Sequence, residues 1–195
     1  MSFMRNLLAV IGLISLIGLI VAAIQVQSVI DEMNRFDERA LDIYSDFIQK
    51  AYESGSAIDA LAYKVKVNEN ITAADIDASI LNIASELNIK NVGELNLSRQ
   101  VELLSGKPYR YVKIYLLCNA MTAASILNHN DAFSSFLPCK LSVVENPQGE
   151  LWIYTLNLDL LIHGGKSIPP ALKAEIIKVR DILNQIMQRA ASGDF

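Results

Sequence analysis

The sequence predicts an α+β protein in three parts: an N-terminal transmembrane helix, a helical stalk, and a compact domain of mostly antiparallel sheet packed against helices. Three observations predict this architecture. Residues 7–24 form an uncharged apolar run, residues 25–53 contain no proline or glycine, and residues 57–195 alternate between strand and helix patterns. We therefore assign residues 1–24 to a transmembrane signal anchor, 25–55 to the stalk and 56–195 to the domain.

The apolar run from Leu7 to Ile24 is long enough to cross a bilayer. A helix rises about 1.5 Å per residue, so about 20 residues span the hydrocarbon core. A cleaved secretory signal is the alternative, because Arg5 precedes the run and Ala22 and Ala23 resemble a cleavage site. The run is longer than the usual apolar region of a signal peptide, about 7–15 residues, which favours a retained anchor.

Positive charge flanking the run predicts its orientation. Arg5 precedes the run, whereas the first basic residue after it is Arg35. The positive-inside rule then places the N-terminus in the cytoplasm and the domain in the periplasm or outside the cell, with one pass through the inner membrane. Small residues lie roughly along one face of the helix, as close approach of another transmembrane helix requires: Gly12, Ser15, Gly18 and Ala22. Such residues are also common in transmembrane helices that have no partner.

The stalk carries an apolar seam with the 3-4 spacing of a coiled coil, about three heptads long. We predict that it binds a partner through Val26, Val29, Met33, Phe36, Ile43 and Phe47, with Ala40 in the same seam. Beyond Ala40 a second apolar side appears, made by Leu41, Tyr44, Ile48 and Tyr52. A helix that is apolar on two sides is buried on two sides, so the stalk packs against its own domain, another chain, or both.

In the first half of the domain, the residue pattern predicts a strand, a helix and two further strands. Apolar and polar residues alternate from Leu61 to Val67, and Thr72 with Asp75 forms a capping box for a helix. A weaker strand follows at Val92–Leu97 and a short helix at Arg99–Ser105, and the apolar segment Tyr111–Cys118 is typical of a central strand.

In the second half of the domain, the residue pattern predicts a helix, a β-hairpin and a terminal helix. Residues 120–128 form the first helix, and the turn 146–149 contains Pro and Gly and joins strands at 141–145 and 151–161. Pro169 and Pro170 introduce the last helix, whose buried face is Leu172, Ile176, Val179, Leu183, Ile186 and Ala190.

Two short boxes resemble a known family. Leu117-Cys118-Asn119 ends one strand, and Leu137-Pro138-Cys139-Lys140 opens the next. With Val143-Val144-Glu145 and the terminal helix, this resembles domain of unknown function 302 of bacteria and archaea, with its CNP and LPCN boxes, over residues 60–190. Ala120 and Lys140 depart from those boxes. The resemblance implies a compact α+β domain, often self-associating, with no activity to carry over, and the membrane anchor is an addition to it.

Composition excludes several function classes. Seventeen basic against 21 acidic residues leave a net charge of -4, which argues against a broad nucleic-acid surface. Two cysteines are too few for a disulfide scaffold or a four-thiolate zinc site. His129 and His163 lack the ligand spacing of a metal site, and no motif of a known catalytic class occurs. We predict no metal, no cofactor and no catalytic residue.

Cys118 and Cys139 are the residues best able to carry chemistry. In an oxidising compartment they form a disulfide if their Cα atoms lie within about 7 Å. A reactive thiol or a metal ligand is a second reading, and packing as small apolar side chains is a third.

Three hypotheses for function follow. The first is a non-catalytic, single-pass accessory subunit that docks on a larger membrane complex, with a respiratory or other redox complex as a plausible host. Its partner is an integral membrane protein or a second copy of the chain. The second is an extracytoplasmic thiol-redox or metal-handling domain that uses Cys118 and Cys139. The third is a module that binds a small ligand between sheet and helices.

Overall fold

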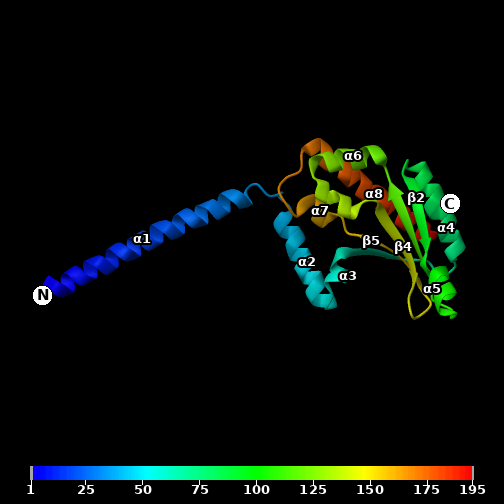
Figure 1. Ribbon diagram of the computed structural model, residues 1–195, viewed down its shortest axis with the longest axis horizontal. Helices are drawn as coiled ribbons and strands as arrows, with labels where there is room; N and C mark the ends of the chain where they lie inside the picture. Colours follow the sequence, from blue (N-terminus) through cyan, green and yellow to red (C-terminus); the bar gives the residue numbers. More distant parts are fainter. Residues whose placement is uncertain (1, 195) are drawn as a thin grey trace.

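The protein is described by a computed structural model that covers residues 2–194, with side chains for residues 6 and 11–194. A long helix projects from an α+β domain (Figure 1). The elements are α1 (Ser2–Met33), α2 (Ala40–Ser54), α3 (Ala57–Leu61), β1 (Ala62–Lys66), α4 (Ala73–Glu86), β2 (Lys90–Asn96), α5 (Leu97–Ser105), β3 (Val112–Cys118), α6 (Ala120–His129), the 3₁₀ helix η1 (Asp131–Phe136), β4 (Cys139–Glu145), β5 (Leu151–Leu156), α7 (Asp159–His163) and α8 (Pro170–Ser192). The predicted α+β class is confirmed.

The strands form one antiparallel sheet in the order β1-β5-β4-β3-β2. The hairpin of β4 and β5 is confirmed, and its turn contains Gly149 at a φ of 80°, where a residue with a Cβ is strained. In the register of β3 and β4, Leu117 lies opposite Cys139. This register brings the two predicted boxes to the same end of two neighbouring strands.

The main core lies between one face of the sheet and the helices α4 and α8. Its fully buried side chains include Ile76, Ile80 and Ile83 of α4, Tyr115, Leu117, Leu141 and Ile153 of the sheet, and Leu183, Ile186 and Met187 of α8. The capping box at the start of α4 is present as predicted, with Thr72 and Asp75 bonding each other's backbone amides. The apolar faces that the helical spacing predicts for α4 and α8 are therefore the faces that these helices bury in the core.

The absence of proline and glycine from residues 25–53 predicts that the first helix continues unbroken through the stalk, and this prediction is wrong. α1 does extend beyond the apolar run to Met33, but residues 34–39 are not helical and α2 begins at Ala40. Phe36 forms an isolated β-bridge with Lys166, and the amide of Asp37 donates to the carbonyl of Gly165 over 2.9 Å. These bonds to the loop after α7 replace helical bonds and hold the break. α2 therefore belongs to the domain, and the boundary lies within residues 34–39 rather than at residue 55.

The second strand of the hairpin is shorter than predicted. β5 ends at Leu156, and residues 159–163 form the short helix α7. The side chain of Asn157 accepts a hydrogen bond from the amide of Asp159 over 3.0 Å, and Asp159 pairs with Arg180 of α8. These polar contacts turn the chain out of the sheet, although its apolar residues continue.

Candidate functional site

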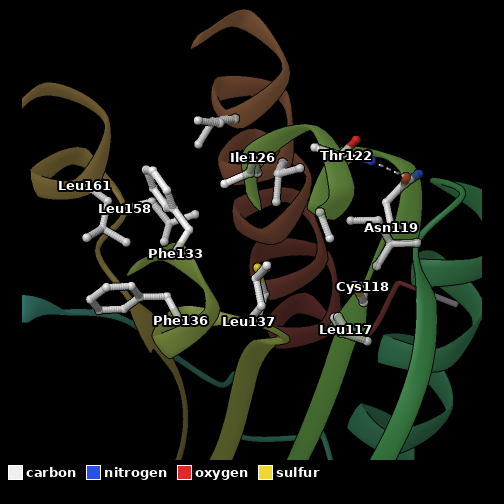
Figure 2. A pocket seen from close by; sticks show the side chains of 15 residues that line it. Leu117, Cys118, Asn119, Thr122, Ile126, Phe133, Phe136, Leu137, Leu158 and Leu161 are labelled. Atoms are coloured by element: carbon white, nitrogen blue, oxygen red, sulfur yellow. Dashed lines mark hydrogen bonds between the residues drawn. The ribbon is translucent and has the colours of Figure 1, made fainter. Parts of the chain in front are cut away.

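A cavity with an apolar lining lies at the end of β3 and β4, enclosed by α6, η1, α7 and α8 (Figure 2). Its free volume is about 50 Å³. The lining residues include no charged side chain and are Ile89, Leu117, Cys118, Asn119, Thr122, Ala123, Ile126, Phe133, Phe136, Leu137, Cys139, Leu158, Leu161, Ile176 and Val179. Phe133 and Phe136 lie on the same side of the cavity as Leu158 and Leu161 (Figure 2). Phe136 is 43% exposed, so η1 is only partly packed on the domain.

The polar groups of the cavity are already engaged with the protein. Asn119 caps α6: its side-chain oxygen accepts the amide of Thr122 over 3.1 Å. Its side-chain nitrogen donates to the carbonyl of Asn88 over 3.4 Å. The thiols and the hydroxyl of Thr122 are the remaining polar side-chain groups, so the cavity suits an uncharged group.

Both predicted cysteines line this one cavity, from the neighbouring strands β3 and β4. Each is a half-buried free thiol. Burial raises the pKa of Cys139 to about 11, and Cys118 adds to that effect. Cys139 is therefore a neutral thiol near pH 7 and behaves as a small apolar side chain that contacts the main core.

A second polar cluster joins the linker between α1 and α2 to the domain. Asp37 is 4% exposed, and its carboxylate lies 2.9 Å from Nδ1 of His163 in α7. It also pairs with Lys173 of α8. Nε2 of His163 lies 3.2 Å from Nη1 of Arg39. Because a guanidinium can only donate, the contact with Arg39 places the acceptor of His163 at Nε2 and its donor to Asp37 at Nδ1.

The charge of Asp37 is stabilised by these partners. Burial by itself raises the pKa of Asp37, but hydrogen bonds from Lys173 and His163 outweigh it and lower the pKa from 3.8 to about 2. Asp37 is thus ionised near pH 7. This junction cluster of Asp37, Arg39, His163 and Lys173 fastens the segment that follows α1 to α7 and α8.

Sequence reasoning missed the junction cluster. His163 is buried, because folding places it against a linker more than a hundred residues earlier in the chain. The signal available in the sequence was the Asp-x-Arg pair of residues 37 and 39, next to the apolar seam. Among the described residues, no group of three His, Cys, Asp or Glu side chains is placed to hold a metal ion.

The family model "Domain of unknown function DUF302" matches residues 63–190. The chain belongs to the DUF302 family. The chain is also similar to a solved structure described as "uncharacterized conserved protein DUF302 from Bacillus stearothermophilus". Identity is 19% and the TM-score 0.55, and the match covers 67% of this chain and 98% of the other. This likeness shows the fold alone. No curated protein matches the chain.

The N-terminal helix α1 lies outside the DUF302 match. It is long and apolar enough between Ile11 and Met33 to span a membrane, and that segment buries nothing against the domain. The four predicted small residues, Gly12, Ser15, Gly18 and Ala22, are all exposed. Open space surrounds Gly12 and Gly18, so the backbone is accessible there to another helix.

The predicted partner-binding residues of the stalk do not share one surface. Val26, Val29, Met33 and Phe36 are exposed, whereas Ile43 and Phe47 are half-buried where α2 packs on α3 and α7. The helix break turns the side of α2 that carries Ile43 and Phe47 toward the domain, so their contact with a partner stays a prediction. The second apolar side is exposed instead: Leu41 by 68%, Ile48 by 64% and Tyr52 by 88%. We call these three residues and Tyr44 the outer face of α2.

Proposed function

We propose that this DUF302 protein is a non-catalytic, single-pass accessory subunit that docks on an integral membrane protein. Docking uses the small-residue face of α1 and the outer face of α2. The observation that carries the proposal is the outer face of α2, which stays exposed next to the anchor although the other side of the same helix packs on the domain.

The outer face of α2 has the chemistry of a protein interface. Its apolar side chains are exposed to water, so covering them with a partner protein is favourable. Exposed apolar patches of this kind often mark interaction sites. Two of the four are tyrosines, which are enriched at interfaces. One of them, Tyr44, also contacts the domain itself. Its hydroxyl donates a hydrogen bond to the carbonyl of Gly164 over 2.6 Å, which holds α2 against the loop after α7.

The charges of α2 favour a protein partner over the surface of the bilayer. The helix carries Asp42, Asp46 and Glu53 against a single Lys50, and Asp46 pairs with that lysine. Helices that lie on anionic lipid are rich in Lys and Arg on the polar face. An acidic amphipathic helix is repelled by such a surface, which leaves its apolar side for protein contact.

The thiol-redox alternative has less support. A reactive cysteine needs a lowered pKa and access to solvent. Cys139 has a raised pKa, and both thiols line an apolar cavity. The structure offers no base or cation beside Cys139 among its described neighbours in that cavity.

A native gel tests the accessory role. The tagged protein is extracted in mild detergent, and the stoichiometry of each band is measured by mass spectrometry. We expect one defined complex with the wild-type chain. The double variant Leu41→Ser with Ile48→Ser and the double variant Gly18→Leu with Ala22→Leu each lose it.

The matched control is Leu104→Ser in α5, which alters a side chain that is 90% exposed. α5 lies at the opposite side of the domain from α2 (Figure 1). This control keeps the complex. A complex that survives both double variants, or a wild-type chain that migrates as a monomer, contradicts the accessory role.

We also propose that the N-terminus is cytoplasmic and that the domain lies on the outer side of the inner membrane. The support is Arg5 before the apolar helix and Arg35 as the first basic residue after it. Protease added to intact spheroplasts then removes the domain, and the same protease added outside inverted vesicles leaves it intact. If the orientation is reversed, the two preparations give the opposite result.

A further inference from the structure

We propose that the cavity at the end of β3 and β4 binds an uncharged hydrocarbon chain. This site is separate from the docking surfaces of the accessory role, and neither the family nor the solved relative assigns a ligand to it. The inference rests on the chemistry of the lining, the size of the cavity, and its position beside the anchor.

The lining selects an apolar, uncharged occupant. No Asp, Glu, Lys, Arg or His lies among the lining residues. The side chain of Asn119 is occupied by the amide of Thr122 and the carbonyl of Asn88. The thiol of Cys139 stays neutral, as argued above. A charged group placed here has no partner to replace its water, whereas apolar cavities of this kind stay dry and take apolar guests.

The size selects a chain rather than a ring. One water-sized group occupies roughly 10–15 Å³ of this kind of volume, so a cavity of about 50 Å³ holds a chain of roughly three to five carbons. An apolar cavity that binds benzene in another protein measures about 150 Å³. Filling the cavity restores dispersion contacts that its lining lacks, so each methylene tightens binding by up to about fourfold.

The position brings the cavity close to the anchor. Leu161 lines the cavity, and His163 in the same five-residue helix α7 contacts Asp37 in the linker. The end of the domain that holds the cavity is therefore the end at which α1 joins it (Figure 1). Two sources supply the same chemistry: the acyl chain of a bilayer lipid, and a free uncharged amphiphile.

Methyl NMR of the full chain in phosphatidylcholine nanodiscs tests the site, with 1-hexanol as the probe. The terminal three to five carbons of hexanol fill the cavity, and the hydroxyl end stays outside it. The methyl groups of Ile126 and Ile176 report from the cavity, and that of Ile58, which is 80% exposed on α3, reports general partitioning. We expect saturable shifts at Ile126 and Ile176 without a parallel shift at Ile58. Hexanoate at pH 7.5, which has the same chain with a charge, binds at least tenfold more weakly.

A matched pair of variants in α6 decides the location. Ala123→Leu fills the cavity from its lining and weakens hexanol binding at least tenfold, whereas Ala124→Leu makes the same change on the exposed side and leaves binding unchanged. The methyl group of Ile80 in the main core confirms that each variant is folded. If Ala123→Leu does not fold, Val179→Ile fills the cavity from α8. Equal binding by the filled variant and Ala124→Leu, parallel shifts at Ile58, or equal binding of hexanoate overturns the proposal.

A spin-labelled lipid distinguishes the two sources. Phosphatidylcholine with a nitroxide near the end of its acyl chain broadens the Ile126 methyl signal if a bilayer lipid enters the cavity. Hexanol binding without such broadening assigns a free amphiphile. The Leu41 and Ile48 variants keep hexanol binding, so a failure of the accessory role and a failure of this site are separable.

Discussion

The two ends of the domain differ in how well they are packed. Between the sheet and the long helices α4 and α8, Ile76, Ile80, Leu183 and Ile186 are at most 1% exposed. At the other end, a smaller cluster of Ile126, Ile162, Ile168 and Ile176 lies beside a cavity and under an exposed Phe136. Both clusters consist of the same kinds of side chain, so composition does not explain the difference.

The difference in packing follows from the length of the helices that cover each end of the domain. α8 serves both ends, with Ile176 and Val179 at the cavity and Leu183 and Met187 in the main core. Its other partners differ: an extended sheet and the 14-residue α4 at one end, and α6, η1 and α7 of 10, 6 and 5 residues at the other. Short elements present few side chains in fixed register, so they leave a void where long elements interdigitate.

The largest expected effect is on the free energy of unfolding, and it compares a truncation in the main core with one beside the cavity. Ile80→Ala in the main core costs about 3–5 kcal/mol of unfolding free energy, because the rigid surroundings keep the new cavity open. Ile126→Ala beside the existing cavity costs about 2 kcal/mol, the low end for such a truncation, because η1 can move toward it. Denaturant unfolding, followed by the fluorescence of the single Trp152, measures both values. Equal costs contradict a difference in packing.

The junction cluster gives the next largest effect. Asp37→Asn removes the charge that Lys173 and His163 stabilise, and we expect a loss of about 2 kcal/mol near pH 7. Because the folded pKa of Asp37 lies below its ordinary value, this stability is present above about pH 4. It is lost as the pH falls toward 2.

Unfolding curves at pH 7, 4, 3 and 2 check the junction. The wild type and Asp37→Asn converge as the pH falls, whereas Asp181→Asn, which alters an exposed carboxylate of α8, stays parallel to the wild type within about 0.5 kcal/mol. A constant difference from pH 7 to pH 2 contradicts the assigned charge of Asp37.

The third prediction concerns Cys139, where the main core meets the cavity. With Cys118→Ser removing the other thiol, burial still raises the pKa of Cys139, so its thiolate fraction at pH 8 is smaller than that of an ordinary cysteine by up to about 100-fold. Iodoacetamide therefore reacts more slowly with the folded protein than with the denatured one, by a factor of that order. The rate rises about tenfold per pH unit up to pH 10, and a plateau below pH 9 contradicts the burial of this thiol.

The smallest effect on stability is expected at the outer face of α2. Leu41→Ser with Ile48→Ser changes the free energy of unfolding by no more than about 0.5 kcal/mol per substitution, because both side chains are exposed before and after the change. Ile43→Ser on the opposite side of the same helix costs more, since that side chain is half-buried. Loss of the membrane complex without loss of stability thus identifies a docking face.

Local patterns in the sequence determined most of the secondary structure. Ile76, Ile80 and Ile83 recur at helical spacing, Thr72 and Asp75 cap that helix, and Gly149 closes the hairpin. The apolar run of α1 predicts a membrane span by length alone. Such signals are visible in sequence because each depends on residues only a few positions apart.

Contacts between distant residues decided the rest. The break at residues 34–39 exists because Asp37 meets His163 and Lys173, and the exposed face of α2 follows from that break. The cavity exists because the register of β3 and β4 sets Leu117 beside Cys139 under three short elements. A periodic pattern records that a side chain is buried but not which surface covers it, so only the tertiary structure could place these sites.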